Sequence, residues 1–192
     1  MSLRQNPRLS ILSLALGLGM LAATAGASAQ PAGASSPSGM KTGSSGASVP
    51  AADKSWAQKA AVGGLAEVEM GKLAQQKASN NQVKQFGSHM VADHSQANDE
   101  LKQVAGAKGV GLPAGPDAKA QAEMKKMQGL SGPAFDKHYM DHMVADHKQD
   151  IAAFEKEAKS GKDPEVKAFA EKSLPTLKEH LQLAQQAQAA VK

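Results

Sequence analysis

Four long stretches of helix-forming residues, separated by short breaks, constrain the fold of this chain more than any other feature. Ala, Lys, Gln, Glu, Leu and Met dominate, and no run alternates between apolar and polar residues with the period of a β-strand. The stretches cover residues 53–78, 79–106, 133–161 and 163–192. At 1.5 Å per residue, helices of about 24 to 29 residues would be about 36 to 43 Å long. Such matched lengths predict an all-α four-helix bundle.

The breaks carry signals that place the helix ends. Asp53 is the expected N-cap of the first helix, and Ser79-Asn80-Asn81-Gln82 fits a capping box at the start of the second. Asp163 followed by Pro164 predicts an N-cap and a first helical position for the last helix. Pro175 lies inside that helix and is expected to kink it.

The lengths of the breaks predict how the helices are arranged. The first two helices and the last two are joined by very short breaks, which favour antiparallel hairpins. The link from Gly106 to Gly132 is longer and contains a predicted short helix from Asp117 to Gln128, so it can cross the bundle from end to end. Two hairpins joined by such a crossover form the ferritin-like arrangement. A simple up-and-down bundle with a folded-over loop is the alternative.

The N-terminal residues have the pattern of a secretory signal peptide spanning residues 1–29. Arg4 and Arg8 precede the apolar run ILSLALGLGMLAA, and Ala27-Ser28-Ala29 forms a cleavage signal before Gln30. The run is too short to span a bilayer, and the absence of cysteine excludes a lipoprotein anchor. We therefore expect cleavage between Ala29 and Gln30 and a periplasmic or secreted protein, with association to the outer membrane as a further option.

Residues 30–52 are rich in Gly, Ser, Pro and Ala and carry a single charge, so we expect a disordered tether that cannot bury enough apolar surface to fold. Residues 53–192, a segment of 140 residues, have the size of one domain. The chain contains no cysteine, so its stability must come from packing, and thiolate chemistry is excluded.

The net charge of +4 does not indicate a nucleic-acid partner. When Arg4, Arg8 and Lys41 are set aside, 19 Lys remain against 18 acidic residues, and the predicted domain contains no Arg. It also has only six aromatic residues. Because nucleic-acid recognition depends on Arg and on aromatic stacking, we exclude this class of partner.

The six-residue sequence HMVADH occurs twice, at His89–His94 and at His142–His147. The apolar stripe of each surrounding helix places the second histidine of each copy, His94 and His147, on the buried face. In the last helix the stripe places His180 inward as well. Three helices thus each direct one histidine to the core, whereas His89, His138 and His142 are expected at the surface.

These three imidazoles predict a site for one transition-metal ion, and Zn, Cu or Fe suit such ligands. The first helix supplies Glu67 or Glu69, between which its Ala-rich pattern does not decide, and Asp150 is a further candidate ligand. Asp93 and Asp146 each precede an inward histidine and could orient a ring by hydrogen bonding. Two methionines, Met90 and Met143, lie one turn before His94 and His147; they would favour Cu(I) unless they only fill gaps in the core.

A second interpretation gives the same histidines a purely structural role. Buried imidazoles hydrogen-bonded to carboxylates or carbonyls can fix helix register without binding a ligand. The protein would then be an interaction module of the cell envelope. We expect metal binding, with a role in the envelope or in stress, ahead of catalysis, and a metal-dependent redox enzyme as the third option. No G-x-S-x-G motif or phosphate-binding Gly loop is present to support hydrolysis or phosphoryl transfer.

The chain resembles a bacterial family of secreted proteins known as domain of unknown function 4142, whose members are often labelled predicted outer-membrane proteins. The resemblance lies in four segments that together span residues 53–192: AEVEMGKLA, FGSHMVADH, SGPAFDKHYMDHMVADH and SLPTLKEHLQLA. It implies a ferritin-like four-helix fold and an extracytoplasmic location, and it implies no established activity.

The sequence departs from the pattern of di-iron ferritin-like proteins, in which Glu-x-x-His motifs on two helices help to hold the metals. Val91, Val144 and Leu177 occupy the positions three residues before the inward histidines, where that pattern requires Glu. This departure argues against a di-iron oxidase.

Overall fold

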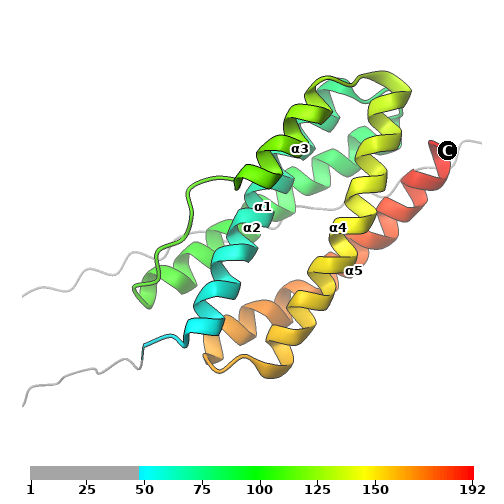
Figure 1. The fold of residues 1–192 in the computed structure, drawn as a ribbon. Coiled ribbons are helices and arrows are strands. Elements are labelled where there is room, and N and C mark those ends of the chain that lie inside the picture. Colours follow the sequence, from blue (N-terminus) through cyan, green and yellow to red (C-terminus); the bar gives the residue numbers. More distant parts are fainter. Residues whose placement is uncertain (1–47) are drawn as a thin grey trace, which may run out of the picture. The chain divides into compact units, whose positions relative to one another are not determined.

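The computed structural model describes residues 48–192, in which helices are connected by short loops and one long link (Figure 1). The helices are α1 (Ala51–Lys77), α2 (Asn81–Ala107), α3 (Ala118–Gln128), α4 (Gly132–Ser160) and α5 (Pro164–Ala190). No strand occurs between residues 48 and 192, which confirms the all-α prediction. Within the same range, no helix combines the length and the hydropathy needed to cross a membrane. The predicted signal peptide and most of the predicted tether lie outside the described residues.

Two antiparallel hairpins, α1–α2 and α4–α5, pack against each other, and contacts at their ends fix their relative direction. The carboxylate of Asp53, near the start of α1, accepts hydrogen bonds from the backbone N–H groups of Lys162 and Asp163, 2.8 and 2.5 Å away. Asp136, near the start of α4, accepts from the backbone N–H groups that precede α2. Thus α1 and α4 run in opposite directions, and α2 and α4 run in the same direction.

The parallel direction of α2 and α4 requires the link between them to cross the length of the bundle. This is the ferritin-like connection, and the up-and-down alternative is wrong. Helix α3 lies within the crossover and packs alongside α1 (Figure 1). Its Met127 is fully buried, and the Lys77 ammonium at the end of α1 donates to the Gln128 carbonyl at 2.7 Å.

Two predicted helix starts are wrong, and a buried carboxylate explains each error. Helix α1 begins at Ala51, so Asp53 lies inside its first turn and binds the α4–α5 turn instead of capping its own helix. The N-cap of α2 is Asn80, whose side chain accepts from Gln82 N–H at 2.8 Å. Ser79 instead donates its hydroxyl and its N–H to Asp136. In both cases a hydrogen bond between hairpins replaces the local one.

The predicted starts of the short helix α3 and of α5 agree with the structure to within one residue. Asp117 caps α3 by accepting from Ala120 N–H at 2.8 Å. Asp163 caps α5 by accepting from the N–H groups of Glu165 and Val166 at 3.0 and 3.1 Å, and Pro164 is the first residue of the helix. Helix α5 continues through Pro175 without a break.

The two helices of the first hairpin approach most closely at a pair of glycines. A Cβ atom added to Gly71 would lie 2.7 Å from the carbonyl oxygen of Gly87, closer than real Cβ contacts allow. A Cβ atom on Gly87 would lie 2.8 Å from the carbonyl oxygen of Gly71. The missing side chains therefore let α1 and α2 pack backbone against backbone.

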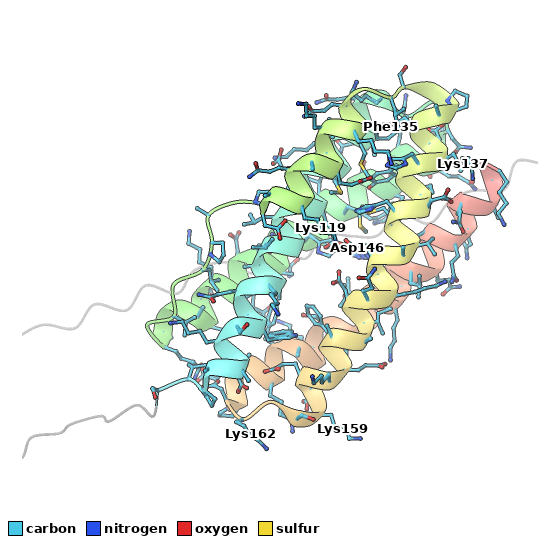
Figure 2. The ribbon with its side chains drawn as sticks, in the orientation of Figure 1. Lys119, Phe135, Lys137, Asp146, Lys159 and Lys162 are labelled. Carbon is cyan, nitrogen blue, oxygen red and sulfur yellow. The ribbon has the colours of Figure 1, made fainter. Side chains whose placement is uncertain are left out.

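The apolar interior consists of two clusters with a polar layer between them. The larger one contains Phe86 and Tyr139, whose rings meet edge to face at 6.1 Å between centroids. The smaller one surrounds Phe169 and Leu101. Fully burying such a side chain contributes about 1.5 to 3 kcal/mol, so these clusters supply the main stabilisation. Exposed lysines such as Lys137, Lys159 and Lys162 point away from the core (Figure 2).

Candidate metal centre

Three histidines from three helices meet between the two apolar clusters. His94 lies on α2, His147 on α4 and His180 on α5, with relative exposures of 7%, 0% and 2%. The distances between their ring centroids are 5.9, 5.2 and 5.4 Å. Each ring offers one nitrogen to a group whose atoms all lie within 4.8 Å of one another. The residues that the apolar stripes placed inward are therefore brought together at one depth of the bundle.

Hydrogen bonds define which nitrogens of His147 and His180 carry a lone pair. His147 Nδ1 lies 3.0 Å from the carbonyl oxygen of Met143, which can only accept, so Nδ1 carries the proton. His180 Nε2 lies 2.8 Å from Asp93 Oδ2, so this nitrogen donates to the carboxylate. The two remaining nitrogens, His147 Nε2 and His180 Nδ1, are 3.4 Å apart. In neutral rings both carry lone pairs, and they face each other with no proton between them.

Glu67 on α1 connects this layer to the fourth helix. The carboxyl group is almost fully buried, at 1% exposure, and Oε2 lies 3.1 Å from His94 Nδ1. Oε1 lies 3.5 Å from His147 Nδ1, but that nitrogen donates to the Met143 carbonyl instead. Two buried atoms, Glu67 Oε1 and His94 Nε2, therefore have no hydrogen-bond partner among residues 48–192.

Burial favours the neutral form of the three imidazoles by lowering the pKa of each. It lowers the pKa of His147 to about 4, with His180 as the next contribution. It lowers the pKa of His94 well below the usual range, and His180 and His147 add to the effect. The pKa of His180 is also lowered by burial, although its bond to Asp93 opposes the shift. Neutral imidazole is the form that binds metal ions.

A group of three carboxyls lies beside the histidines. Glu67, Asp146 and Asp150 each offer one oxygen, and these oxygens lie within 4.8 Å of one another. Burial raises the pKa of Asp150 to about 7, with the charge of Asp146 as the second cause. Burial also raises the pKa of Glu67 well above its usual range, with Asp150 and Asp146 as the further causes. Asp93 accepts a hydrogen bond from His180 and can orient its ring, whereas Asp146 accepts none from a histidine among residues 48–192 and belongs to the group of carboxyls.

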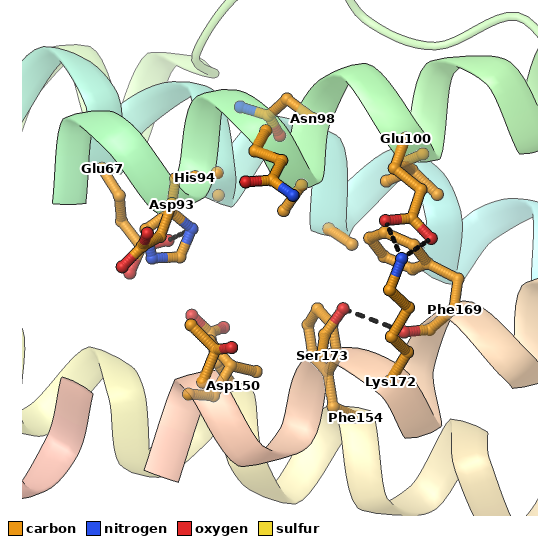
Figure 3. Close-up of a pocket in the computed structure, with 18 of the residues that line it drawn as sticks. Glu67, Asp93, His94, Asn98, Glu100, Asp150, Phe154, Phe169, Lys172 and Ser173 are labelled. Carbon is orange, nitrogen blue, oxygen red and sulfur yellow. Dashed lines mark hydrogen bonds and ion pairs between the residues drawn. The ribbon is translucent and has the colours of Figure 1, made fainter. Parts of the chain in front are cut away.

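A cavity of about 160 Å³ opens onto this centre (Figure 3). His94, Glu67, Asp93 and Asp150 lie at one end, and the aromatic residues Phe154 and Phe169 are part of its lining. A void of this volume admits a small ring-sized molecule as well as water. The centre is thus buried between helices but reachable from one side.

Comparison with known proteins places the chain in a family. The domain of unknown function DUF4142 matches residues 38–187. The chain belongs to the DUF4142 family. No curated protein matches it. The crystal structure of a DUF305 protein from Streptomyces coelicolor has a similar fold, with a TM-score of 0.62. The two chains are 15% identical, and the likeness covers 73% of this chain and 93% of the other.

Several residues considered from sequence lie outside the centre of this DUF4142 protein. Glu69 is half-exposed and pairs with Lys72, so Glu67 is the glutamate that reaches the histidines. His89 is exposed, as predicted. His138 and His142 are only partly exposed, because α3 covers this part of α4 and its Glu123 contacts His138.

Two further polar groups of this DUF4142 protein were not singled out by sequence reasoning. The Tyr139 hydroxyl is buried and has no hydrogen-bond partner between residues 48 and 192; burial, and then the charge of Glu67, raise its pKa well above the usual range. The amide nitrogen of Asn98, beside the cavity, is buried and has no hydrogen-bond partner among the residues that the structure describes. Tyr139 lies on the apolar stripe of its helix, as a core residue would, and Asn98 has no distinctive spacing. The sequence therefore carried no signal that distinguished these two residues from residues that only fill the core.

Proposed function

We propose that this DUF4142 protein binds one transition-metal ion, of Zn, Cu or Fe, through the ring nitrogens of His94, His147 and His180. Asp93 orients His180, and Glu67 orients His94 through its Nδ1. A metal ion held by three imidazoles would keep a further coordination position for water or another ligand, and His94 and His180 line the cavity. The expected role is metal binding in the cell envelope, with catalysis as the less favoured outcome.

The observation that carries this proposal is the pair of facing nitrogens. In a tetrahedral site with metal–nitrogen bonds of 2.0 to 2.1 Å, two ligand nitrogens lie about 3.3 Å apart. The separation of His147 Nε2 and His180 Nδ1 is 3.4 Å. Two lone pairs at this distance repel each other in the absence of a cation. The neighbouring His94 Nε2 is buried and has no hydrogen-bond partner in the described part of the chain, and a shared metal ion would satisfy all three nitrogens.

Metal content and affinity test the proposal. The mature protein, stripped with a chelator and then offered Zn²⁺, Cu²⁺ or Fe²⁺, should retain about one ion per chain after dialysis. A free metal concentration about 100 times Kd should stabilise the fold by about 2.7 kcal/mol. The triple substitution of His94, His147 and His180 to Ala should abolish both effects. If the triple variant does not fold, His147→Gln replaces it in the test, because glutamine keeps a side chain of similar size.

A matched control removes the same number of histidines elsewhere. Substituting His89, His138 and His142 with Ala should leave the stoichiometry and the affinity unchanged. If the wild type retains no ion and its melting temperature does not respond to any of the three metals, the metal-binding proposal is wrong.

One observation favours a second candidate function, in which the polar layer only stabilises the bundle. Each imidazole already has one partner, which is Met143 for His147, Asp93 for His180 and Glu67 for His94. Such a layer fixes the register of the helices, and the protein would be an interaction module of the envelope. A metal-free wild type, with His147→Gln strongly destabilised, would support this alternative.

A further inference from the structure

Three carboxyls, those of Glu67, Asp146 and Asp150, lie close together beside the histidines, and no lysine between residues 48 and 192 forms an ion pair with any of them. Asp146 and Asp150, one turn apart on α4, neither accept a hydrogen bond nor form an ion pair with any residue between 48 and 192. Both are mostly removed from solvent. Burial raises the pKa of Asp146; His142 and Lys119 oppose this shift, but neither pairs with the carboxyl. Like charges held this close repel unless a cation or protons lie among them.

Glu67 provides an independent indication of a ligand. Its Oε2 contacts His94, but Oε1 is fully buried and accepts no hydrogen bond from the described residues; its neighbour His147 Nδ1, 3.5 Å away, donates to the Met143 carbonyl. Glu67 also offers one carboxylate oxygen to the compact group that it forms with Asp146 and Asp150. Leaving a buried carboxylate oxygen without a partner costs about 1 to 3 kcal/mol or more, so the arrangement favours a bound cation.

The surroundings give the group routes to solvent on two sides. Glu67 and Asp150 line the cavity of about 160 Å³ next to His94. Asp146 lines a second cavity, of about 550 Å³, between α1, α3 and α4. Asp146 lies on the side of α4 that faces α1 and α3 (Figure 2). A hydrated ion can therefore reach the group while retaining some of its waters.

We infer that Glu67, Asp146 and Asp150 form a second cation site, distinct in chemistry from the histidine site. All three ligands are carboxylates, which suit Mn²⁺, Mg²⁺ and Ca²⁺, whereas imidazoles suit Zn, Cu and Fe. The two sites communicate through Glu67, which binds the hard cation with Oε1 and holds His94 Nδ1 with Oε2. This inference stands without the proposed transition-metal function, because its ligands do not include a histidine.

The second site is tested by adding Mn²⁺ to the metal-stripped mature protein. Electron paramagnetic resonance measures the binding as a loss of the signal of free aqueous Mn²⁺. The wild type should bind one Mn²⁺ per chain, and Ca²⁺ or Mg²⁺ in excess should compete. The double variant Asp146→Asn with Asp150→Asn should bind Mn²⁺ at least about tenfold more weakly. It should fold, because the substitution removes like-charge repulsion, and it should still bind Zn²⁺ if the histidine site is a metal site.

Two further variants separate this inference from the proposed function. Glu155→Gln changes an exposed carboxylate on the same helix, paired with Lys178, and should leave Mn²⁺ binding unchanged. The triple histidine variant should retain Mn²⁺ although it loses Zn²⁺. Absence of Mn²⁺ binding in the wild type, or binding that survives the double Asn substitution, overturns the second site regardless of the result for Zn²⁺.

Discussion

His180 owes the direction of its free nitrogen to Asp93, a residue that the repeated HMVADH sequence supplies directly before His94. The hydrogen bond of 2.8 Å holds the proton on Nε2 and leaves Nδ1 facing His147. Asp93 is 40% exposed at its side chain, so it contributes little to the core itself. Asp93 is therefore expected to act on metal binding by orienting the His180 imidazole.

Asp93→Ala should weaken metal binding without destabilising the bundle. Loss of a carboxylate that orients a metal-binding histidine typically lowers affinity about 10- to 100-fold. Competition with a chelator of known affinity measures the change, and urea unfolding of the metal-free protein should differ by less than about 1 kcal/mol. Asp99→Ala, an exposed position on the same helix, serves as control and should change neither quantity. Equal affinities for the wild type and Asp93→Ala would remove Asp93 from the site.

At the scale of the helix, the Gly71–Gly87 contact sets the spacing of the first hairpin. Gly71→Ala should destabilise the protein by about 1 to 3 kcal/mol, because the new methyl group overlaps the α2 backbone. Alanine is more favourable than glycine in a helix by about 1 kcal/mol, so a Gly→Ala substitution at a position with free space should stabilise the protein instead. Gly63, on the same helix, has no atom within 4 Å of an added Cβ.

Gly63→Ala should accordingly stabilise the protein by up to about 1 kcal/mol. Urea denaturation of both variants measures the difference. Stabilisation by both substitutions would show that α1 and α2 can separate at no cost.

The turns between helices are a second feature at this scale. Asp136→Ala should destabilise the fold by about 1 to 3 kcal/mol, since the N–H groups of Ser79 and Asn80 lose their acceptor. Asp117→Ala, which removes an exposed cap from α3 alone, should cost only about 1 kcal/mol. Thermal and urea unfolding should rank the two variants in this order; equal losses would mean that Asp136 acts only as a local cap.

The helices and their connectivity could be predicted from sequence because they depend on the apolar periodicity within each helix and on the lengths of the segments between helices. Apolar periodicity placed His94, His147 and His180 inward, and the length of the link predicted the crossover. The starts of α1 and α2 could not be predicted, because Asp53 and Ser79 bind partners more than 50 residues away. The choice between Glu67 and Glu69 depended on contacts with other helices, since the Ala-rich stripe of α1 defines its buried face weakly.

For the whole molecule, the remaining prediction is export. Expressed as the full chain in a bacterium, the protein should appear outside the cytoplasm with Gln30 as its first residue, as measured by mass spectrometry of the fractionated cells. Ala29→Leu should block processing and retain the precursor mass, because cleavage requires a small residue at this position. Ala34→Leu is the control and should be processed normally. A cytoplasmic protein that retains residues 1–29 would contradict the prediction.

The exchange of carboxylates between the hairpins also bears on how the molecule assembles. The α1–α2 turn takes its acceptor from Asp136, and the α4–α5 turn takes its acceptor from Asp53. Each hairpin therefore supplies the carboxylate that the turn of the other hairpin requires. When only the first hairpin has been synthesised, the amides of the α1–α2 turn can bind only water. Completion of both turns is thus delayed until the second hairpin arrives, which couples the two hairpins into one cooperative unit and disfavours a stably folded fragment.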